Sequence, residues 1–266
     1  MATAPDQRSP EELVGAIYSS LARIWGRQHW WPAQSRFEVI VGAFLTQNTS
    51  WTNVELALQQ LRSARVLNLA GIRNTPVRRL ERLIRSSGYF RQKARRLKYF
   101  VHFLDKRYGG SLTKMFAQPT PLLREQLLSL NGVGPETADS ILLYAGQHAS
   151  FVVDAYTKRV AGRHGILPAD ALYEDVRELF ERSLASVELL DLETAKQVAA
   201  ASHKPSRMSL ASRSQLAQVY NEMHGLLVGV GKKYCLKSAP QCEGCPLNHL
   251  LSGNGVQKGE IKPASI

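Results

Sequence analysis

A tight turn between two apolar helical segments offers the clearest chemistry in the sequence. Residues 127–139 read LLSLNGVGPETAD, so a helix ends, Gly132, Val133 and Gly134 turn the chain, and Pro135 opens the next helix. Glycine permits backbone conformations that other residues avoid, and it lets the main chain approach a ligand closely. Outward-facing amides at such a helix start would suit a phosphate group. An ordinary corner between two helices, without a ligand, is the alternative interpretation.

Three of the four tryptophans of the chain lie close together near its start. Trp30 and Trp31 precede Pro32, and Trp51 follows a short polar stretch. Flat aromatic walls can hold a base flipped out of a duplex, and indole faces attract a cationic base such as adenine methylated at N3 or guanine methylated at N7. Aromatic residues at this density also commonly form a core, so simple packing is the alternative.

Asp154 and Glu136 are acidic residues whose positions could serve catalysis. Asp154 follows the apolar run FVV and precedes a helical segment, which is typical of a helix N-cap. Glu136 comes directly after Pro135, where a negative charge stabilises a helix N-terminus. A structural role is therefore open for both residues.

Together, the hairpin and the Asp154 segment resemble the helix-hairpin-helix DNA glycosylases of the endonuclease III superfamily, over most of residues 11–250. The resemblance implies that Asp154 is the catalytic carboxylate, which stabilises the oxocarbenium-like sugar of glycosidic cleavage and orients water. Members that also cut the strand carry a Schiff-base lysine in the second hairpin helix. This chain has Glu136 there. Because a carboxylate cannot form a Schiff base, the resemblance implies a monofunctional enzyme without AP lyase activity.

Further motifs resemble the 3-methyladenine DNA glycosylase branch of that superfamily, namely WWP, LTQNT, SGYF before QKA, and VVDAY. By this resemblance the flipped, alkylated purine would be held by Trp30, Trp31, Pro32, Trp51 and Lys232, with Glu136 and Asp154 lining the same pocket. A surface lysine of a basic protein is the alternative for Lys232. Gln47 and Asn48 lie where relatives place a polar residue that probes the gap left in the duplex.

The stretch from Arg82 to Arg107 is rich in lysine and arginine and has one acidic residue, Asp105. A charge run is usually a solvated helix face, but beside the hairpin we expect it to follow phosphates and set non-specific affinity. The expected partner is double-stranded DNA that contains damaged bases. The residues expected to contact it are Gln47, Asn48, Gly132, Val133, Gly134, Thr137, Arg91, Lys93, Arg95 and Arg96.

Cys235, Cys242 and Cys245 have the spacing C-x6-C-x2-C. Many endonuclease III relatives continue with x5-C and bind a 4Fe-4S cluster through four thiolates. Leu251 stands at the fourth position here, and His249 is a possible substitute in a site for iron or zinc. A degenerate loop of free thiols is the favoured alternative, and no cofactor is expected to be required for the chemistry.

Composition limits the class of protein. The chain has 266 residues, of which 34 are Lys or Arg and 22 are Asp or Glu, for a net charge of +12. Hydrophobic residues make up 44%, which is enough for a core and excludes wholesale disorder. The sequence has no bilayer-spanning apolar run, no signal-peptide pattern and an odd number of cysteines. We expect a soluble, cytoplasmic monomer, nucleoid-associated if bacterial.

The elements that must position these residues are predicted to be helices. Ser9, Pro10 and Glu12 form a helix start, and helical periodicity or boundary signals mark residues 13–24, 37–45, 53–61, 81–84, 92–108, 122–130 and 140–145. We predict an all-α fold. The resemblance implies two helical lobes with a catalytic cleft between them, one formed by residues 30–148 with the hairpin motif at 121–146. The other would combine residues 1–29 and 149–266, including the cysteine loop at 235–251. Residues 199–214 are predicted to be an insertion or mobile loop, and the residues after 253 a polar tail.

Two other functions are also compatible with the sequence. One is endonuclease III-type excision of oxidised pyrimidines with strand nicking, in which another amine such as Lys232 forms the Schiff base. The other is a helix-hairpin-helix module that binds DNA without catalysis.

Overall fold

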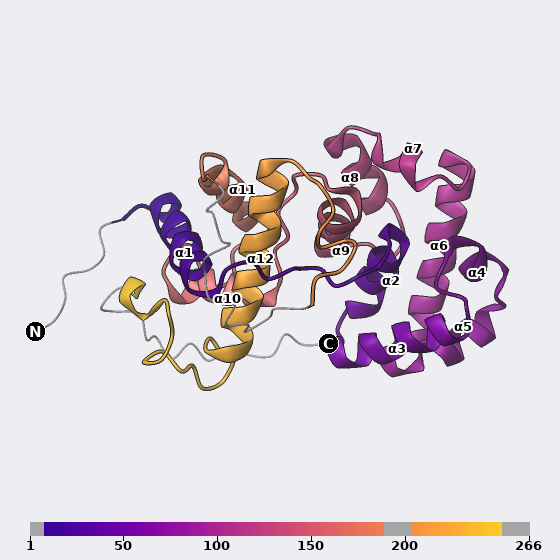
Figure 1. Ribbon diagram of the computed structural model, residues 1–266, viewed down its shortest axis with the longest axis horizontal. Helices are drawn as coiled ribbons and strands as arrows, with labels where there is room; N and C mark the ends of the chain where they lie inside the picture. Colours follow the sequence, from indigo (N-terminus) through magenta and orange to yellow (C-terminus); the bar gives the residue numbers. More distant parts are fainter. Residues whose placement is uncertain (1–7, 189–203, 252–266) are drawn as a thin grey trace, which may run out of the picture. The chain divides into compact units, whose positions relative to one another are not determined.

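The computed structural model describes residues 8–188 and 204–251, and within these ranges it is helical and has no strand (Figure 1). The predicted all-α fold is therefore confirmed. The α-helices are α1 (Pro10–Trp25), α2 (Arg36–Thr46), α3 (Trp51–Ser63), α4 (Leu69–Asn74), α5 (Val77–Leu83), α6 (Phe90–Tyr108), α7 (Leu112–Phe116), α8 (Thr120–Leu128), α9 (Pro135–Ser140), α10 (Ala155–Arg163), α11 (Tyr173–Leu184) and α12 (Gln215–Lys233). Shorter helical turns are η1 (Arg85–Ser87), η2 (Ile141–Gly146) and η3 (Asn248–Leu250).

The described residues form two compact units. Unit 1 contains those within 1–28, 153–202 and 222–266, and unit 2 contains those within 29–152 and 203–221. Residues 204–221 were expected in the lobe that contains residues 149–266, but they group with unit 2. Two hydrogen bonds account for this grouping. The Met208 amide donates to the Ala33 carbonyl at 3.0 Å, and the Ala33 amide donates to Ser206 Oγ at 3.2 Å.

The segment predicted to be an insertion or mobile loop, residues 199–214, is described from residue 204 onward. Residues 199–203 lie outside the described residues, as does the predicted tail from residue 253 onward. Residues 204–214 contain turns but no helix, which agrees with a loop, while Ser206, Met208 and Ser209 are buried. The contact with Ala33 therefore attaches this loop to unit 2.

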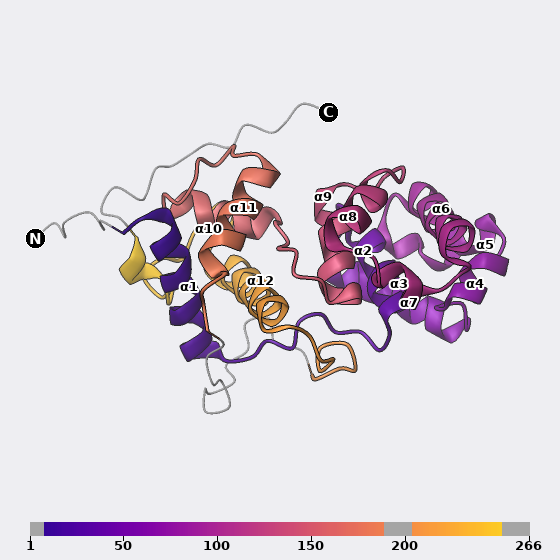
Figure 2. The ribbon, with the colours of Figure 1, turned by 90° about the horizontal axis from the view of Figure 1, so that it is seen from above.

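Unit 2 is built around α2, whose residues 37–45 are all buried. Ser35 caps this helix, with its side chain accepting a hydrogen bond from the Glu38 amide at 3.1 Å. Around α2 lie α3, α6, α9 and η2, which can be followed in Figure 2. The helices predicted at 37–45, 53–61 and 92–108 are confirmed as parts of α2, α3 and α6.

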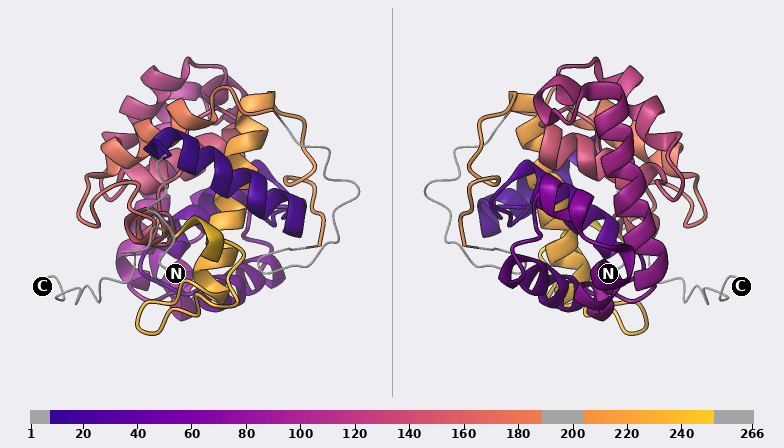
Figure 3. Two further views of the ribbon diagram at one scale, coloured as in Figure 1. Left: turned by 90° about the vertical axis from the view of Figure 1, so that its left-hand side faces the viewer. Right: turned by 90° about the vertical axis from the view of Figure 1, so that its right-hand side faces the viewer.

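Unit 1 begins with the capping box predicted at Ser9 and Glu12, in which each side chain bonds the backbone amide of the other. The helix that follows, α1, packs against α11 (Figure 3). In α12, residues 219–231 are all buried, and the boundary between the units falls within this helix. This part of the helix is buried on all its faces, for example at Leu226, Leu227 and Val230, so its sequence has no clear amphipathic pattern.

The second hairpin helix differs from the expected regular continuation over 140–145. The chain is α-helical only through Ser140, and η2 is a π-helix. The segment ILLYA is apolar at every position and fully buried, so it contains no periodic signal that could separate a π-helix from an α-helix. No described helix has both the length and the apolar character needed to cross a membrane.

Candidate functional site

Asp154 is the N-cap of α10, as its position before a helical segment predicts. Its Oδ1 accepts hydrogen bonds from the Thr157 amide at 2.8 Å and from Thr157 Oγ1 at 3.1 Å. His224 Nε2 lies 3.5 Å from the other oxygen, Oδ2. The Asp154 side chain is 14% exposed and that of His224 is 4% exposed, so the pair is largely screened from water while the carboxylate stays accessible.

The electrostatic balance at Asp154 favours the ionised carboxylate. Burial acts to raise its pKa, but His224 and the two hydrogen bonds from Thr157 outweigh burial and bring the pKa of Asp154 below its ordinary value. His224 was missed at the sequence level. Because His224 is far from Asp154 along the chain, no local sequence pattern links the two residues. The packing of α12 brings them together.

Lys232 lies near Asp154 in unit 1, at the end of α12. Lys232 is exposed, as a surface lysine would be, but partial loss of water around its ammonium group lowers its pKa, although the charge of Asp154 acts in the opposite direction. The preceding residue, Gly231, lies against Tyr156, because a Cβ there would lie 2.2 Å from Tyr156 Cδ1. Glycine thus lets α12 approach α10 and brings the amine and the carboxylate into one neighbourhood.

The predicted hairpin is present in unit 2 between α8 and α9. Gly132 has φ +79°, a left-handed conformation that favours glycine, and the Val133 amide closes the turn on the Leu130 carbonyl at 3.0 Å. Gly134 is the N-cap of α9, and Pro135 is its first residue. Glu136 is exposed in the first turn of α9, whereas Thr137 is buried.

A buried ion pair behind the hairpin was not predicted. Asp139 in α9 is fully buried and accepts two hydrogen bonds from the Arg124 guanidinium at 2.8 and 3.0 Å. Ser150 Oγ donates to the same carboxylate at 2.6 Å. The pairing ties α8 to α9, so this acid is structural. The available sequence signal was weak, namely an acidic residue shortly before the apolar run ILLYA.

Gln47 and Asn48 follow α2 directly. Gln47 contacts the hairpin, with Nε2 donating to the Gly132 carbonyl and to Thr137 Oγ1, both at 2.9 Å. Arg96 from α6 donates to Gln47 Oε1 at 2.6 Å. Asn48 is exposed and has φ +52°. The structure therefore brings Gln47, Arg96, Gly132 and Thr137 into one cluster.

The aromatic residues near the start lie together in unit 2. The rings of Trp31 and Trp51 are 5.2 Å apart and nearly perpendicular, at 89°, and Trp30 meets Trp31 at 73°. Tyr144 from η2 lies 5.1 Å from Trp31. Trp30 and Trp31 are buried, as packing in a core requires, whereas Trp51 is half-buried. Pro32 is half-buried beside them.

One prediction for the basic stretch is wrong. Lys93, expected to contact DNA, is 1% exposed and donates to the carbonyls of Leu45 at 2.8 Å and Ser87 at 2.6 Å. Burial, with a smaller effect from the charge of Arg96, lowers its pKa from 10.5 to about 8. Lys93 therefore anchors α6 to the core and cannot reach a phosphate. Arg91 and Arg95 are exposed.

The cysteine loop in unit 1 does not supply the ligands of a four-thiolate cluster. Cys235 is buried, and its sulfur accepts a hydrogen bond from Arg163 at 3.2 Å. Burial, with smaller effects from the two other thiols, raises the pKa of Cys245. Leu251 offers no donor, and His249 Nε2 lies 3.4 Å from Ser20 Oγ. Within the part of the chain that the structure describes, no three His, Cys, Asp or Glu side chains are grouped to hold a metal ion.

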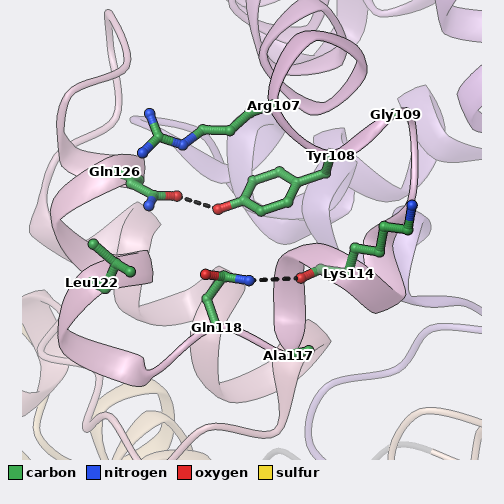
Figure 4. A pocket seen from close by; sticks show the side chains of 8 residues that line it. All are labelled: Arg107, Tyr108, Gly109, Lys114, Ala117, Gln118, Leu122 and Gln126. Carbon is green, nitrogen blue, oxygen red and sulfur yellow. Dashed lines mark hydrogen bonds between the residues drawn. The ribbon is translucent and has the colours of Figure 1, made fainter.

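A pocket of about 640 Å³ lies at the C-terminal end of α6, next to α7 and α8 (Figure 4). Its lining includes Arg107, Tyr108, Lys114, Gln118, Leu122 and Gln126. None of the residues predicted for catalysis or base binding lines this pocket.

Comparisons with known proteins relate the chain to DNA repair proteins. Residues 41–186 match the sequence family described as "HhH-GPD superfamily base excision DNA repair protein". A protein of Methanocaldococcus jannaschii named "Putative DNA repair glycosylase" is 42% identical over 239 residues, which cover 89% of this chain and 94% of that protein.

Two solved structures are similar across both units. The 3-methyladenine DNA glycosylase MagIII of H. pylori, bound to 1,N6-ethenoadenine, has a TM-score of 0.66 and 29% identity over 85% of this chain and 98% of that one. A trapped covalent intermediate of endonuclease III with DNA has a TM-score of 0.67 over 91% of this chain and 95% of that one. At 21% identity, the latter similarity concerns the fold alone.

Proposed function

This chain belongs to the HhH-GPD superfamily of base excision DNA repair proteins, and on that premise we propose that it is a monofunctional DNA glycosylase that releases alkylated purines such as 3-methyladenine. Membership makes it an enzyme of the DNA glycosylase family that acts on DNA. The substrate class and the absence of strand cleavage are the proposed parts.

The observation that carries the proposal is the environment of Asp154. Thr157 holds one carboxylate oxygen with two hydrogen bonds, and the balance of interactions keeps the group ionised. Positive charge develops on the sugar as the glycosidic bond breaks, and a fixed anion beside it stabilises that charge. The same carboxylate can orient the water that attacks the sugar. Asp154 is therefore assigned the catalytic role.

Glu136 supports hydrolysis without strand cleavage. It occupies the first turn of α9, where bifunctional relatives carry the Schiff-base lysine, and a carboxylate cannot form that covalent bond. The side chain is exposed, so it is available to line a base-binding site. The alternative is a bifunctional enzyme in which Lys232 is the amine. Lys232 lies near Asp154 and has a lowered pKa, which are the observations in favour of that alternative.

Two observations support an alkylated purine as the substrate. The similarity to a 3-methyladenine DNA glycosylase covers 85% of this chain. In addition, Trp30, Trp31, Trp51 and Tyr144 form an aromatic cluster in unit 2, and Trp51 is only half-buried. An indole face attracts a cationic base, and an N3- or N7-alkylated purine carries that charge and a weakened glycosidic bond. Because Trp51 is the half-buried member of the cluster, its ring is the proposed surface on which a flipped base stacks.

Double-stranded DNA is the proposed partner, bound by a monomer. The hairpin offers Gly132 and Gly134, and exposed cations of α6, including Arg91 and Arg95, supply phosphate contacts. We propose that the chemistry requires no cofactor, because hydrolysis by a carboxylate needs only water. The three cysteines lack the fourth thiolate of a 4Fe-4S cluster, so no step is assigned to one.

The test is base release from a panel of duplexes that each contain one lesion, with a parallel set of reactions in which borohydride is present throughout. The proposal predicts release of free 3-methyladenine and no covalent adduct. An adduct trapped by borohydride, together with release of an oxidised pyrimidine, would establish the bifunctional alternative. Duplex binding without release of any base would establish a binding module instead.

A further inference from the structure

Gln47 uses its whole side-chain amide to join α6 to the hairpin. Both N–H groups are engaged, one on the Gly132 carbonyl and one on Thr137 Oγ1, each at 2.9 Å. The oxygen accepts from Arg96 at 2.6 Å. Because a guanidinium only donates, Arg96 fixes the oxygen of the amide on its own side and directs the NH2 group to the hairpin.

Arg96 also lies directly against the turn. A Cβ at Gly132 would be 2.0 Å from Arg96 Nε, so a side chain there would displace the guanidinium, and φ +79° favours glycine as well. One helical turn earlier, Lys93 bonds the Leu45 carbonyl near the end of α2. The two side chains of α6 thus tie the end of α2 and the hairpin to one rigid helix.

We propose that Arg96 and Gln47 are positioning residues for the hairpin. Arg96 orients the Gln47 amide, and Gln47 holds the Gly132 turn and the first turn of α9 in the geometry that receives phosphate. The inference rests on the proposed function, because phosphate binding by the hairpin belongs to it. It gives both residues a role other than the direct DNA contacts expected from the sequence. In this arrangement Gln47 has no N–H left with which to probe a duplex.

The first test uses hydrogen exchange in the free protein. The reporter is the Val133 amide, which bonds the Leu130 carbonyl within the turn. Gln47→Ala and Arg96→Ala should each speed its exchange about tenfold, the factor that corresponds to one typical net hydrogen bond. Arg95→Ala removes an exposed arginine from the adjacent position and should leave the rate unchanged. An unchanged Val133 rate in Gln47→Ala would overturn the proposal.

The second test separates positioning from direct contact with DNA. Affinity for undamaged duplex is measured against salt concentration, where each lost phosphate contact reduces the slope by about 0.9. Gln47→Ala and Arg96→Ala should each weaken binding about tenfold with an unchanged slope, the equivalent of one hydrogen bond. The double variant should bind no more weakly than the weaker single variant, whereas Arg95→Ala should lower the slope and add to Gln47→Ala.

A reduced slope in Arg96→Ala, or additive effects of Arg96→Ala and Gln47→Ala, would identify Arg96 as a direct phosphate contact and contradict the proposal. If Arg96→Ala does not fold, Arg96→Lys replaces it, because lysine keeps the charge but lacks the planar donor group. If the wild-type protein binds no duplex, the proposed function fails, but the exchange experiment still decides whether Gln47 and Arg96 hold the hairpin.

Discussion

The two oxygens of Asp154 have different surroundings, and this difference defines its chemistry. Thr157 binds Oδ1 from within the same helical turn, which the N-cap position of Asp154 predicts from the sequence. His224 faces Oδ2 from α12. No sequence pattern predicted that contact, because it depends on the tertiary packing of two distant helices in unit 1.

Replacing His224 should change the pH dependence of base release. Ionised Asp154 is the active form, so activity falls as pH decreases through its pKa, and His224 is the leading group that lowers this pKa. In His224→Gln the pKa of Asp154 rises, so the acid limb of the pH–rate profile should move to higher pH. Single-turnover base release measured from about pH 3 upward, a range that extends below the ordinary pKa of a carboxyl, follows this shift.

His249→Gln is the matched control for this prediction. His249 belongs to the same unit, and its ring lies beside Ser20. Its replacement should leave the acid limb in place. If neither variant shifts the limb, His224 does not set the ionisation of Asp154.

Lys93 gives a prediction about stability. Lys93→Met leaves the carbonyls of Leu45 and Ser87 without their buried ammonium donor, which should lower the free energy of unfolding at pH 7 by about 1–3 kcal/mol. Urea unfolding measures the change. Arg95→Met, an exposed control on the same helix, should remain within about 0.5 kcal/mol of the wild type.

The contribution of Lys93 to the free energy of unfolding should change with pH in a definite direction. Its pKa is about 8 in the folded protein and 10.5 ordinarily, so between these values the unfolded chain binds more protons. Stability of the wild type should therefore rise with pH in this window relative to Lys93→Met. If the difference in the free energy of unfolding between the two proteins stays constant from pH 7 to pH 10, folding does not lower the pKa of Lys93.

Among the elements, the hairpin could be predicted best from the sequence. The π-helix η2 that continues it could be predicted least. Glycine at the turn and proline at the first position of α9 are local signals, so the boundaries of the turn follow from the sequence. The π-helix η2 carries no such signal, since its residues are uniformly apolar. Lys93 shows a similar limit, because its place in a basic run concealed that its side chain turns into the core.

Gly132 and Gly134 should respond differently to alanine. Gly132→Ala places a side chain at φ +79° and against Arg96, so it should lower the free energy of unfolding by about 1–2 kcal/mol or more. Gly134 has φ −93° and open space where a Cβ would lie, so Gly134→Ala meets no backbone strain or clash and should cost only about 0.5–1 kcal/mol, because alanine is a poorer N-cap than glycine. Urea unfolding of both variants measures this difference.

Duplex binding adds a second criterion for these two glycines. If the backbone of the turn approaches a phosphate closely, Gly134→Ala should weaken duplex binding although it lowers stability less than Gly132→Ala does. Equal stability of Gly132→Ala and the wild type would contradict the geometry of the turn. Unchanged duplex affinity in both variants would contradict its assignment as a phosphate site.

For the whole molecule, the sequence established the helical class and the family but only part of the chain's path. Caps and periodicity act locally, and they predicted α1, α2, α3 and α6. The grouping of residues 204–221 with unit 2 depends on the contacts of Ser206 and Met208 with Ala33, which no local pattern encodes. The net charge of +12 fits a nucleic-acid partner, while the proposed chemistry depends on one carboxylate.

The most direct test of this account is the single-turnover release of 3-methyladenine from alkylated duplex DNA by the wild type and by Asp154→Asn. Asparagine keeps the size of the side chain and a hydrogen-bond acceptor for Thr157, but it removes the negative charge. The account predicts release by the wild type and a rate at least about a hundredfold lower in the variant, the scale of losing one electrostatic stabiliser. Duplex affinity should remain within about twofold, since Asp154 is not assigned to phosphate binding. Equal release by both proteins, or none by the wild type, would contradict it.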